Sequence, residues 1–300
     1  MVEVAAAVIE RPDGSFLLAQ RPAGKVYAGW WEFPGGKVEA GEPTERALAR
    51  ELHEELGIEV RTAYPWITRV HIYEHATVML HFFRVTEWAG EPHGKENQAF
   101  VWQRIDAPMA SPMLPANAPV LASLALPLEY AITDAQTLGA AEQLSRVEAR
   151  MKGGLRLVQL RDKDHWERAR LIYVVTRMAR QYGAKLLVNG GPAADGIHYG
   201  AQELMTMRAR PEGGLIAASC HTAQELGHAM AIGLDFVVLG PVKATPSHPG
   251  ASLLGWEGFR RIAEGASIPV YAIGGLRPAD LHDARRAGAH GLAMISGSWA

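Results

Sequence analysis

Eight short apolar runs follow one another in the second half of the chain, and they restrict the possible folds more than any other feature. Helical segments alternate with these runs. This order predicts parallel strands, and eight of them suggest an α/β barrel of the TIM type, (β/α)8. The predicted strands are YAITD (130–134), RLVQLR (156–161), KLLVN (185–189), GIHYG (196–200), LIAASC (215–220), DFVVLG (235–240), PVYAIGG (269–275) and GLAMISG (291–297).

Two helices of a complete barrel have no room in this sequence. The segment NGGPAADGIHYG (189–200) is too short for a helix between the third and fourth strands. The sequence ends at Ala300, directly after the eighth strand. We therefore predict a barrel that lacks some of its helices.

The first part of the chain has a different pattern. Strand-like runs surround a single helical pattern at 43–56, which predicts an α+β domain with a mixed or antiparallel sheet. A stretch rich in proline and alanine (107–129) leads from this domain into the barrel. We predict two domains, 1–126 and 127–300. The strand-like runs are VEVAAAVIE (2–10), SFLLAQ (15–20), TVMLHFFRV (77–85) and AFVWQR (99–104).

Composition limits which binding partners and which cellular compartment we expect. A formal net charge of -2 gives no general attraction to nucleic acid or to an anionic membrane, so we expect neither as a partner. The single cysteine, Cys220, excludes an internal disulfide and fits a reducing compartment. The N-terminus reads as a first strand rather than a signal peptide, and no run reaches about 18 apolar residues. These features predict a cytoplasmic protein.

The stretch RELHEELG (50–57) places Glu51, Glu54 and Glu55 on one face of a predicted helix, where like charges repel. One interpretation is a solvated acidic face, in which Arg50 pairs with its neighbours. The other is a metal site, because carboxylate oxygens are hard ligands suited to Mg²⁺ or Mn²⁺. Apolar leucines on another side of the helix and a glycine loop before it favour the metal site.

The loop and helix together resemble the Nudix box. Gly36 is followed by five residues, Glu42, seven residues, and then Arg50-Glu51-Leu-His-Glu-Glu-Leu-Gly. Three further segments resemble MutT-type Nudix hydrolases, which hydrolyse 8-oxo-dGTP to the monophosphate and pyrophosphate. These segments are WEFPGGKVEAGE (31–42), GEPHGKENQAFVW (90–102) and PANAPVLASL (115–124).

The MutT resemblance implies roles for particular residues. Glu51 or Glu96 would orient and deprotonate the attacking water, and Glu54 would share in catalysis through the metal. The ligands of Mg²⁺ or Mn²⁺ would be Gly36, Glu51, Glu54, Glu55 and Glu96.

Base recognition would use a separate set of residues. The amide of Asn117 can donate and accept at once, which suits reading a purine edge. Arg21 is a candidate for nucleotide contacts and Phe33 for the pocket wall. The alternatives are a helix cap for Asn117, a surface charge for Arg21 and a core position for Phe33.

The second half resembles the thiamine-phosphate synthase family and its TenI relatives, through YAITD, VQLRDK, DGIHYG, SCHT, DFVVLGPV, IPVYAIGGL and GAHGLAMISG. This family implies a barrel that joins an aminopyrimidine diphosphate to a thiazole phosphate with Mg²⁺. Loops after the seventh and eighth strands commonly bind phosphate in barrels. The implied phosphate and substrate residues are Gln159, Arg161, Lys163, Asn189, Thr245, Ser247, Gly274, Gly275 and Ser296.

The chain departs from the synthases at several of these positions. Asn189 is followed by Gly190, where the family has the aspartate that holds Mg²⁺; Glu203 stands in place of a second acidic ligand, and His248 in place of a lysine. We therefore expect a degenerate or altered barrel that binds a thiamine-related phosphate. His221 is a candidate for proton transfer, with a buried, hydrogen-bonded histidine as the alternative, and Cys220 is expected in the core.

The leading hypothesis is an Mg²⁺-dependent hydrolase that removes 8-oxo-dGTP and so keeps oxidised nucleotides out of DNA during replication and repair. A second hypothesis keeps the Nudix chemistry but takes a thiamine-related diphosphate as the substrate. A third is a bifunctional enzyme with an active thiamine-phosphate synthase, and a fourth makes the barrel a non-catalytic binding module.

Overall fold

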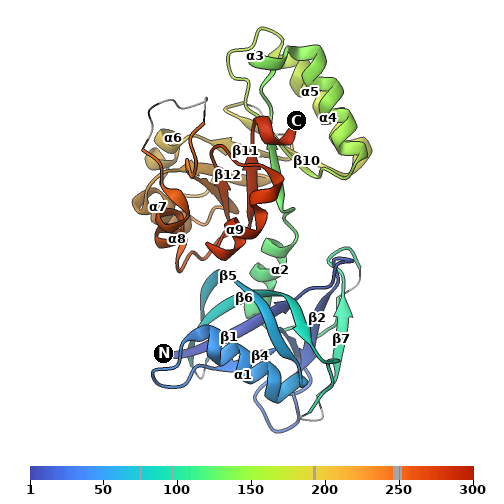
Figure 1. The fold of residues 1–300 in the computed structure, drawn as a ribbon, viewed down its shortest axis with the longest axis vertical. Coiled ribbons are helices and arrows are strands. Elements are labelled where there is room, and N and C mark those ends of the chain that lie inside the picture. The colour runs from blue at the N-terminus through green and yellow to red at the C-terminus, as the bar shows by residue number, and fades with distance from the viewer. Residues whose placement is uncertain (75, 96–97, 108, 192–193, 246–249, 251) are drawn as a thin grey trace. The chain divides into compact units, whose positions relative to one another are not determined.

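The structure is a computed structural model that describes residues 1–300 except 75, 96–97, 108, 192–193, 246–249 and 251. The chain divides into two compact units, Met1–Ala125 and Leu126–Ala300 (Figure 1). Glu96, Ser247 and His248, which the sequence singles out, lie outside the described residues.

The first unit contains a mixed sheet and a smaller antiparallel sheet. β1 (Val2–Ile9) pairs in parallel with β6 (Thr77–Ala89), while β4 (Gly35–Lys37) and β5 (Glu59–Ile72) complete the order β4-β1-β6-β5. β2 (Phe16–Gln20) lies between β3 (Trp31–Glu32) and β7 (Phe100–Gln103) in the second sheet. The predicted α+β fold with a mixed sheet is confirmed.

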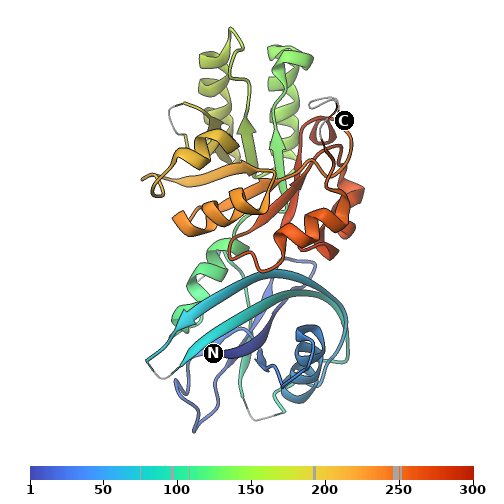
Figure 2. The same cartoon turned by 90° about the vertical axis from the view of Figure 1, so that its left-hand side faces the viewer.

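The predicted helix is α1 (Thr44–Leu56), which lies within the curve of β5 and β6 (Figure 2). Its apolar face buries Leu48, Leu52 and Leu56 against the inner face of β1 and β6. The helix ends at Gly57, whose positive φ of 67° suits a residue without a Cβ. A short 3-10 helix (Pro115–Asn117) and α2 (Ala118–Leu124) close the unit.

The second unit is a closed, parallel, eight-stranded barrel. All eight predicted strands are present and pair in sequence order, so the TIM-type fold is confirmed. The strands are β8 (Glu129–Ile132), β9 (Leu157–Leu160), β10 (Lys185–Asn189), β11 (Gly196–Tyr199), β12 (Leu215–Cys220), β13 (Phe236–Leu239), β14 (Val270–Ile273) and β15 (Gly291–Met294).

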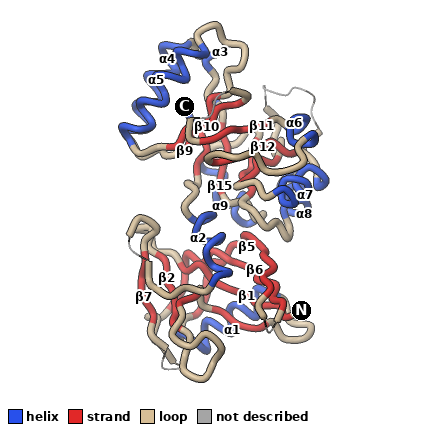
Figure 3. The backbone as a smooth tube through the Cα atoms, turned by 180° about the vertical axis from the view of Figure 1, so that it is seen from behind, coloured by secondary structure: helices blue, strands red, loops and turns tan. Residues whose placement is uncertain are grey.

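Helices cover the outside of this barrel between most of the strands, and α4 and α5 run side by side (Figure 3). They are α3 (Ala135–Leu138), α4 (Ala140–Lys152), α5 (Arg168–Tyr182), α6 (Ala201–Thr206), α7 (Ala223–Ile232), α8 (Gly255–Ala263) and α9 (Leu281–Arg286), with a 3-10 turn at Pro278–Asp280. The described residues between β10 and β11 form no helix, and after β15 there is only the 3-10 turn Ser296–Ser298. The predicted gap in the helical layer between β10 and β11 is therefore present among the described residues.

Two aromatic residues hold the ends of the barrel. Trp299 is buried against α4 and α5, and its Nε1 donates to the carbonyl of Ile132 at 2.8 Å. At the start of the unit, His290 Nε2 lies 2.9 Å from the carbonyl oxygen of Leu126. No helix among the residues that the structure describes has the length and apolar character needed to cross a membrane.

Candidate functional site

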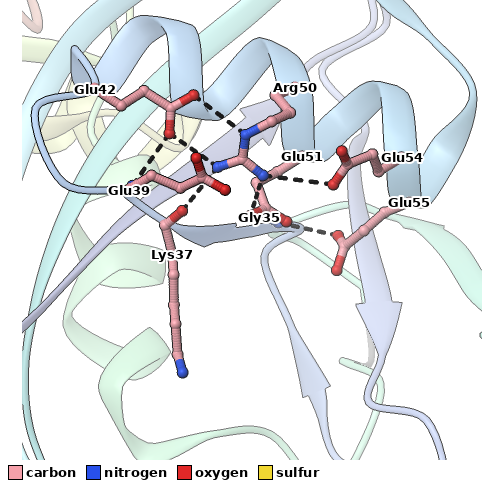
Figure 4. Close-up of polar contacts among 8 residues, drawn as sticks. All are labelled: Gly35, Lys37, Glu39, Glu42, Arg50, Glu51, Glu54 and Glu55. Atoms are coloured by element: carbon pink, nitrogen blue, oxygen red, sulfur yellow. Dashed lines mark hydrogen bonds and ion pairs between the residues drawn. The ribbon is translucent and has the colours of Figure 1, made fainter.

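Arg50 relieves the crowding of negative charge on α1 by contacting both the helix and the loop before it (Figure 4). Its Nη1 donates to Glu51 Oε1 at 2.8 Å and to Glu54 Oε2 at 3.4 Å. Its Nη2 donates to Glu42 Oε2 at 2.9 Å and to the carbonyl of Lys37 at 3.0 Å. The carboxylates of Glu42 and Glu51 hold the pKa of Arg50 above its usual range. Arg50 and Glu42 thus link α1 to the loop before it.

The glycines of the loop allow it to approach β1 and the carboxylates of α1 closely. A Cβ at Gly36 would lie 2.1 Å from the carboxyl carbon of Glu51. A Cβ at Gly35, whose φ is +143°, would lie 2.1 Å from the carbonyl oxygen of Ala5 in β1. Gly35 therefore requires glycine, whereas a Cβ at Gly36 would displace the end of the Glu51 side chain.

The three glutamates differ in exposure. The side chain of Glu54 is 56% exposed, whereas that of Glu51 is 17% exposed and contacts Arg50. Glu55 accepts a hydrogen bond from the Gly35 amide at 3.2 Å, and burial raises its pKa to about 7. The charges of Glu32 and Glu51 raise this pKa further, so Glu55 is a desolvated carboxylate that a cation would stabilise.

The donor set fits the divalent cation that the Nudix family generally needs. Among the described residues, no three His, Cys, Asp or Glu side chains already form a ligating group. Glu51 and Glu55 nevertheless line one cavity with Gly36, and carboxylate and carbonyl oxygens are ligands that Mg²⁺ and Mn²⁺ prefer. The raised pKa of Glu55 is the observation that fits an ion at this place.

This cavity has a volume of about 730 Å³, and all three predicted nucleotide-binding residues line it. It is large enough for a nucleotide. The predicted residues on its wall are Gly36, Glu51, Glu55, Arg21, Phe33 and Asn117. Glu54 is not among the described residues that line it.

Asn117 and Phe33 lie in different positions within this cavity. Asn117 is buried at the end of the 3-10 turn, and its Nδ2 donates to the carbonyl of Trp31 at 3.4 Å. Its side chain makes no cap hydrogen bond to α2, so the alternative role as a helix cap is wrong. Phe33 packs between Phe16 and Phe82, and it therefore belongs to the core as well as to the cavity wall.

Arg21 forms an ion pair with Glu32, a residue that the sequence did not identify. Arg21 Nη1 lies 2.7 Å from both carboxylate oxygens of Glu32, and its Nε donates to the carbonyl of Val26. Burial raises the pKa of Glu32. The side chain of Arg21 is 23% exposed, so its charge is partly buried as well as paired. A glutamate between Trp31 and Phe33 in an apolar strand was the available signal.

The barrel has a second cavity of about 320 Å³, formed at the carboxyl ends of β11, β12, β13, β14 and β15. Four predicted phosphate residues line it: Thr245, Gly274, Gly275 and Ser296. Gly275 has a positive φ of 61°, and a Cβ there would lie 2.3 Å from the carbonyl oxygen of Ala244. Close approach of these backbones therefore depends on glycine.

The other predicted barrel residues are not among the described residues that line this cavity. Arg161 Nη2 donates to Asp134 at 3.1 Å, and Lys163 Nζ lies 3.7 Å from Glu203. Glu203 Oε2 also accepts from the Gly200 amide at 2.7 Å. The remaining two residues of this group, Gln159 and Asn189, are both buried.

The magnesium site of the synthases does not fit the described residues at the ends of these strands. Gly190 offers no side-chain ligand, and Glu203 is held by a lysine and a backbone amide. Arg168 Nη2 donates to the carbonyls of Asn189 and Gly190 at 2.9 and 2.6 Å, which places a cation where a metal ligand was expected.

Cys220 and His221 both line the barrel cavity but differ in exposure. Cys220 is buried, and burial raises its pKa to about 12, so the thiol is protonated at neutral pH and belongs to the core as predicted. His221 is 50% exposed, with Nδ1 3.6 Å from Glu225 Oε2. The alternative of a buried histidine is therefore wrong.

Comparisons with known proteins agree with the division of the chain. Residues 5–123 match the NUDIX domain family, and residues 129–297 match the thiamine monophosphate synthase (TMP-TENI) family. The first part is 44% identical to the CTP pyrophosphohydrolase of Escherichia coli, with 40% of this chain and 89% of the relative aligned. It is 40% identical to the 8-oxo-dGTP diphosphatase of Haemophilus influenzae over the same shares of each chain.

The second part is 34% identical to the thiamine-phosphate synthase of Chloroflexus aurantiacus, with 56% of this chain and 82% of the relative aligned. These matches cover the loop and helix with Gly36 and Glu51 on one side and the glycine loops of the barrel on the other. The chain therefore belongs to two families, as a MutT-like Nudix hydrolase domain fused to a barrel of the thiamine-phosphate synthase (TMP-TENI) family.

Proposed function

We propose that the Nudix domain is an Mg²⁺-dependent pyrophosphohydrolase whose preferred substrate is 8-oxo-dGTP. The observation that carries this proposal is the cavity of about 730 Å³, whose wall includes Glu51 and Glu55 of α1 together with Asn117. One nucleotide can therefore reach the hydrolytic carboxylates with its phosphates and an amide with its base. The Haemophilus influenzae relative named for 8-oxo-dGTP supports this choice of substrate. The Escherichia coli relative named for CTP supports the alternative that CTP is the substrate.

The residues of the box have distinct tasks in this reaction. Glu51, Glu54, Glu55 and the carbonyl of Gly36 would hold the cation, which when bound would polarise the phosphoryl oxygens and offset charge on the departing pyrophosphate. Arg50 fixes the position of the Glu51 carboxylate through the 2.8 Å hydrogen bond. Glu51 would orient the attacking water and accept its proton. Glu96, the second candidate for this step, lies outside the described residues.

Asn117 would determine which base is accepted. Its Nδ2 already donates to the Trp31 carbonyl, and its Oδ1 remains an acceptor. Oxidation at C8 converts the N7 of guanine from an acceptor into an N–H donor, which changes the pattern that one amide can pair with. A buried amide that fits one pattern and not the other can discriminate strongly, because a mismatched base leaves buried polar groups unpaired.

The substrate proposal is tested by kcat/KM for 8-oxo-dGTP, dGTP, CTP and dCTP with Mg²⁺. We expect 8-oxo-dGTP to exceed dGTP by about 100-fold or more, the size of effect that paired polar groups in a site produce. Asn117→Leu removes both the acceptor and the donor, and it should reduce this preference. Equal rates for 8-oxo-dGTP and dGTP, or a clear preference for CTP, would refute the assignment while leaving the Nudix chemistry intact.

A thiamine-related diphosphate is the alternative substrate, because the Nudix domain is fused to a barrel of the thiamine-phosphate synthase family. The same kinetic panel should include the aminopyrimidine diphosphate and thiamine diphosphate. Turnover of either compound above that of 8-oxo-dGTP would favour this alternative.

For the barrel, we propose binding of a small-molecule phosphate monoester rather than full thiamine-phosphate synthase activity. Thr245, Gly274, Gly275 and Ser296 share one cavity with the exposed His221, which could move a proton on the bound molecule. Ser247, also predicted to contact phosphate, lies outside the described residues. Calorimetry with thiazole phosphate tests binding, and an assay of thiamine phosphate formation tests synthesis. Efficient synthesis would show that Gly190 does not prevent the metal-dependent reaction.

A further inference from the structure

The loop between β2 and β3 (residues 21–30) brings two positive charges to the wall of the nucleotide cavity. Arg21 begins this loop and Lys25 lies near its middle, and both line the cavity of about 730 Å³. Neither residue belongs to the Nudix box, which lies in the next loop and in α1. The phosphates of a nucleotide are negatively charged, so a cation at this place can contribute to binding.

Arg21 is committed to partners within the protein. Its Nη1 donates to both carboxylate oxygens of Glu32 at 2.7 Å, and its Nε donates to the carbonyl of Val26 at 2.8 Å. These contacts join the loop to β3. A phosphate that displaced Glu32 from Arg21 would leave a partly buried carboxylate without its counter-charge, which is unfavourable.

The rest of the loop is held in place as well. Gln20 Nε2 donates to the carbonyl of Gly29 at 2.8 Å, and the ring of Tyr27 packs against Tyr73, with 5.7 Å between the ring centroids. Tyr27 has a positive φ of 61°, a conformation that persists in a residue with a Cβ only where its surroundings hold it. Lys25 therefore projects from a backbone that is fixed on both sides.

Lys25 acts on carboxylates at two ends of the cavity. Burial raises the pKa of Glu32 and of Glu55, and the charge of Lys25 opposes this rise at each. Glu55 belongs to the metal-binding face of α1. Glu32 follows Trp31, whose carbonyl accepts the hydrogen bond from Asn117, the residue proposed to read the base. The ammonium group therefore lies near the part of the cavity between the base and the phosphates that a cation would hold.

We propose that Lys25 binds the phosphate next to the sugar of the nucleotide, and that Arg21 is a positioning residue that holds the loop of Lys25. This inference rests on the proposed binding of a nucleoside triphosphate in the cavity. The phosphate next to the sugar is the group that lies between the base and the phosphates held at α1. The flexible stem of a lysine allows its ammonium to exchange its present contacts for a phosphate oxygen.

The contact is tested by NMR titration of the full chain in EDTA with two pairs of ligands, 8-oxo-dGMP with 8-oxo-deoxyguanosine and CMP with cytidine. The ratio of monophosphate affinity to nucleoside affinity isolates the contribution of the phosphate. Lys25→Met should lower this ratio about 10-fold, the value of one charge-assisted hydrogen bond, and leave the nucleoside affinity unchanged. Lys25→Arg keeps the charge and should keep most of the ratio.

Arg61→Gln is the matched control. It removes an exposed positive charge of the same unit from a residue that is not among the described residues lining the cavity. The ratio should therefore be unchanged. An equal fall in Arg61→Gln and Lys25→Met would mean that both charges act only by general attraction, and the contact of Lys25 would be refuted. A ratio that Lys25→Met does not change would refute it as well. Binding of a monophosphate to the barrel is the same in all these chains and cancels in the comparison.

The positioning role is tested with Arg21→Lys, which keeps a counter-charge for Glu32 but cannot bind Glu32 and Val26 together. It should lower the ratio of affinities. The double variant with Lys25→Met should be no worse than Lys25→Met alone, because both substitutions act on one contact. An unchanged ratio in Arg21→Lys, or losses that add in the double variant, would overturn the positioning role and leave the contact of Lys25 intact.

Failure of the proposed substrate gives a different result from failure of this inference. If CMP binds better than 8-oxo-dGMP and its ratio falls in Lys25→Met, the substrate assignment is wrong and the role of Lys25 stands. If 8-oxo-dGMP is preferred and Lys25→Met changes neither ratio, the assignment stands and the role of Lys25 is wrong. Absence of binding of all four compounds to the unsubstituted chain would overturn both.

Discussion

Glu51, Glu54 and Glu55 lie within little more than one turn of α1, and each has a different environment. Glu51 is held by Arg50, Glu54 is largely exposed, and Glu55 is desolvated with a pKa raised to about 7. Burial without a counter-charge is unfavourable for a carboxylate, so the ionised Glu55 lowers the stability of the metal-free protein. Such a cost is expected where function rather than stability has selected the residue.

Replacing Glu55 with glutamine should stabilise the metal-free protein. The folded-state pKa of about 7 is above the ordinary value of 4.5, so stability falls as pH rises through this interval and the cost is complete at pH 8. Glu55→Gln should raise the free energy of unfolding of the Nudix domain by about 1–3 kcal/mol at pH 8 in EDTA, and by much less at pH 5. Hydrogen exchange of the α1 amides at both pH values measures this difference.

The same variant should lose hydrolysis in Mg²⁺, because glutamine is a weaker ligand than a carboxylate. Glu59→Gln, at an exposed position just after the helix, is the control and should change neither stability nor activity. If Glu55→Gln destabilised the metal-free domain at pH 8, the carboxylate would have a stabilising partner outside the described residues.

Single residues of the Nudix site were predictable to different degrees. The spacing of the box located Gly36 and Glu51 because each is required at a fixed place on one loop and helix. The pair of Arg21 and Glu32 was not predictable, because it depends on the antiparallel register that places Gln20 opposite Trp31. Arg21 was identified alone, as a nucleotide contact, and its partner was missed.

At the scale of elements, α1 and the loop before it behave as one unit through Arg50. Its guanidinium makes hydrogen bonds to two glutamates of the helix, to Glu42 and to the carbonyl of Lys37. A planar group with several donors can make these contacts together, whereas an ammonium group is a single point charge.

Arg50→Lys should therefore lower kcat/KM by about 10–100-fold, as is typical when a group that orients a ligand is lost. The fold should be unchanged, since Leu48, Leu52 and Leu56 still anchor α1 in the core. Arg46→Lys, an exposed arginine on the same helix, is the matched control. Full activity of Arg50→Lys would show that charge alone is sufficient at this position.

Element by element, the barrel was more predictable than the sheets of the first unit. Its strands are short and buried on both sides, so each appears as an apolar run. β5 was not predicted because it is half exposed, contains Pro65, and has register shifts against β6. The polar interior of the barrel was also missed, since His198 was read as part of a family motif rather than as an inward-facing residue.

The buried His198 gives the barrel a predictable dependence on acid. Its folded-state pKa is lowered to about 3, below the ordinary value of 6.5, so the unfolded chain binds a proton that the folded barrel does not. Stability should fall as pH drops from about 6.5 towards 3, by about 1.4 kcal/mol per pH unit from this residue. Hydrogen exchange of the β11 amides between pH 6.5 and 4.5 tests this slope.

His198→Gln should remove this contribution to the slope, whatever its effect on absolute stability. His282→Gln, at an exposed position of α9, is the control and should keep the slope of the unsubstituted chain. A parallel pH dependence in both variants would mean that carboxylates, not His198, cause the acid sensitivity.

At the scale of the whole molecule, each buried cluster belongs to one unit. The clusters around α1 and around Phe33 are formed by residues before Leu126, and the three barrel clusters by residues from Leu126 onward. Each unit therefore has the core that a domain needs to fold. The predicted division, 1–126 and 127–300, rests on the change of patterning near this boundary.

Two cavities with different chemistry in two such units should respond separately to substitution. Glu54→Gln should lower Mg²⁺-dependent hydrolysis by about 10²–10⁴-fold, the range for removing a group that acts in the transition state. It should leave phosphate binding by the barrel unchanged. Ser296→Ala, in the barrel cavity, should do the reverse, with kcat/KM for hydrolysis preserved and phosphate affinity reduced.

Measuring both quantities in both variants makes the comparison self-controlled, since each variant serves as the folding control for the other. If phosphate bound to the barrel changes the Kd of a nucleotide in the unsubstituted chain, the binding free energies are coupled, and by linkage the nucleotide must change phosphate affinity by the same factor. A titration of phosphate in the presence of a slowly hydrolysed nucleotide analogue would detect a coupling as small as fivefold, about 1 kcal/mol. We expect no coupling, because each described cavity is lined by residues of a single unit.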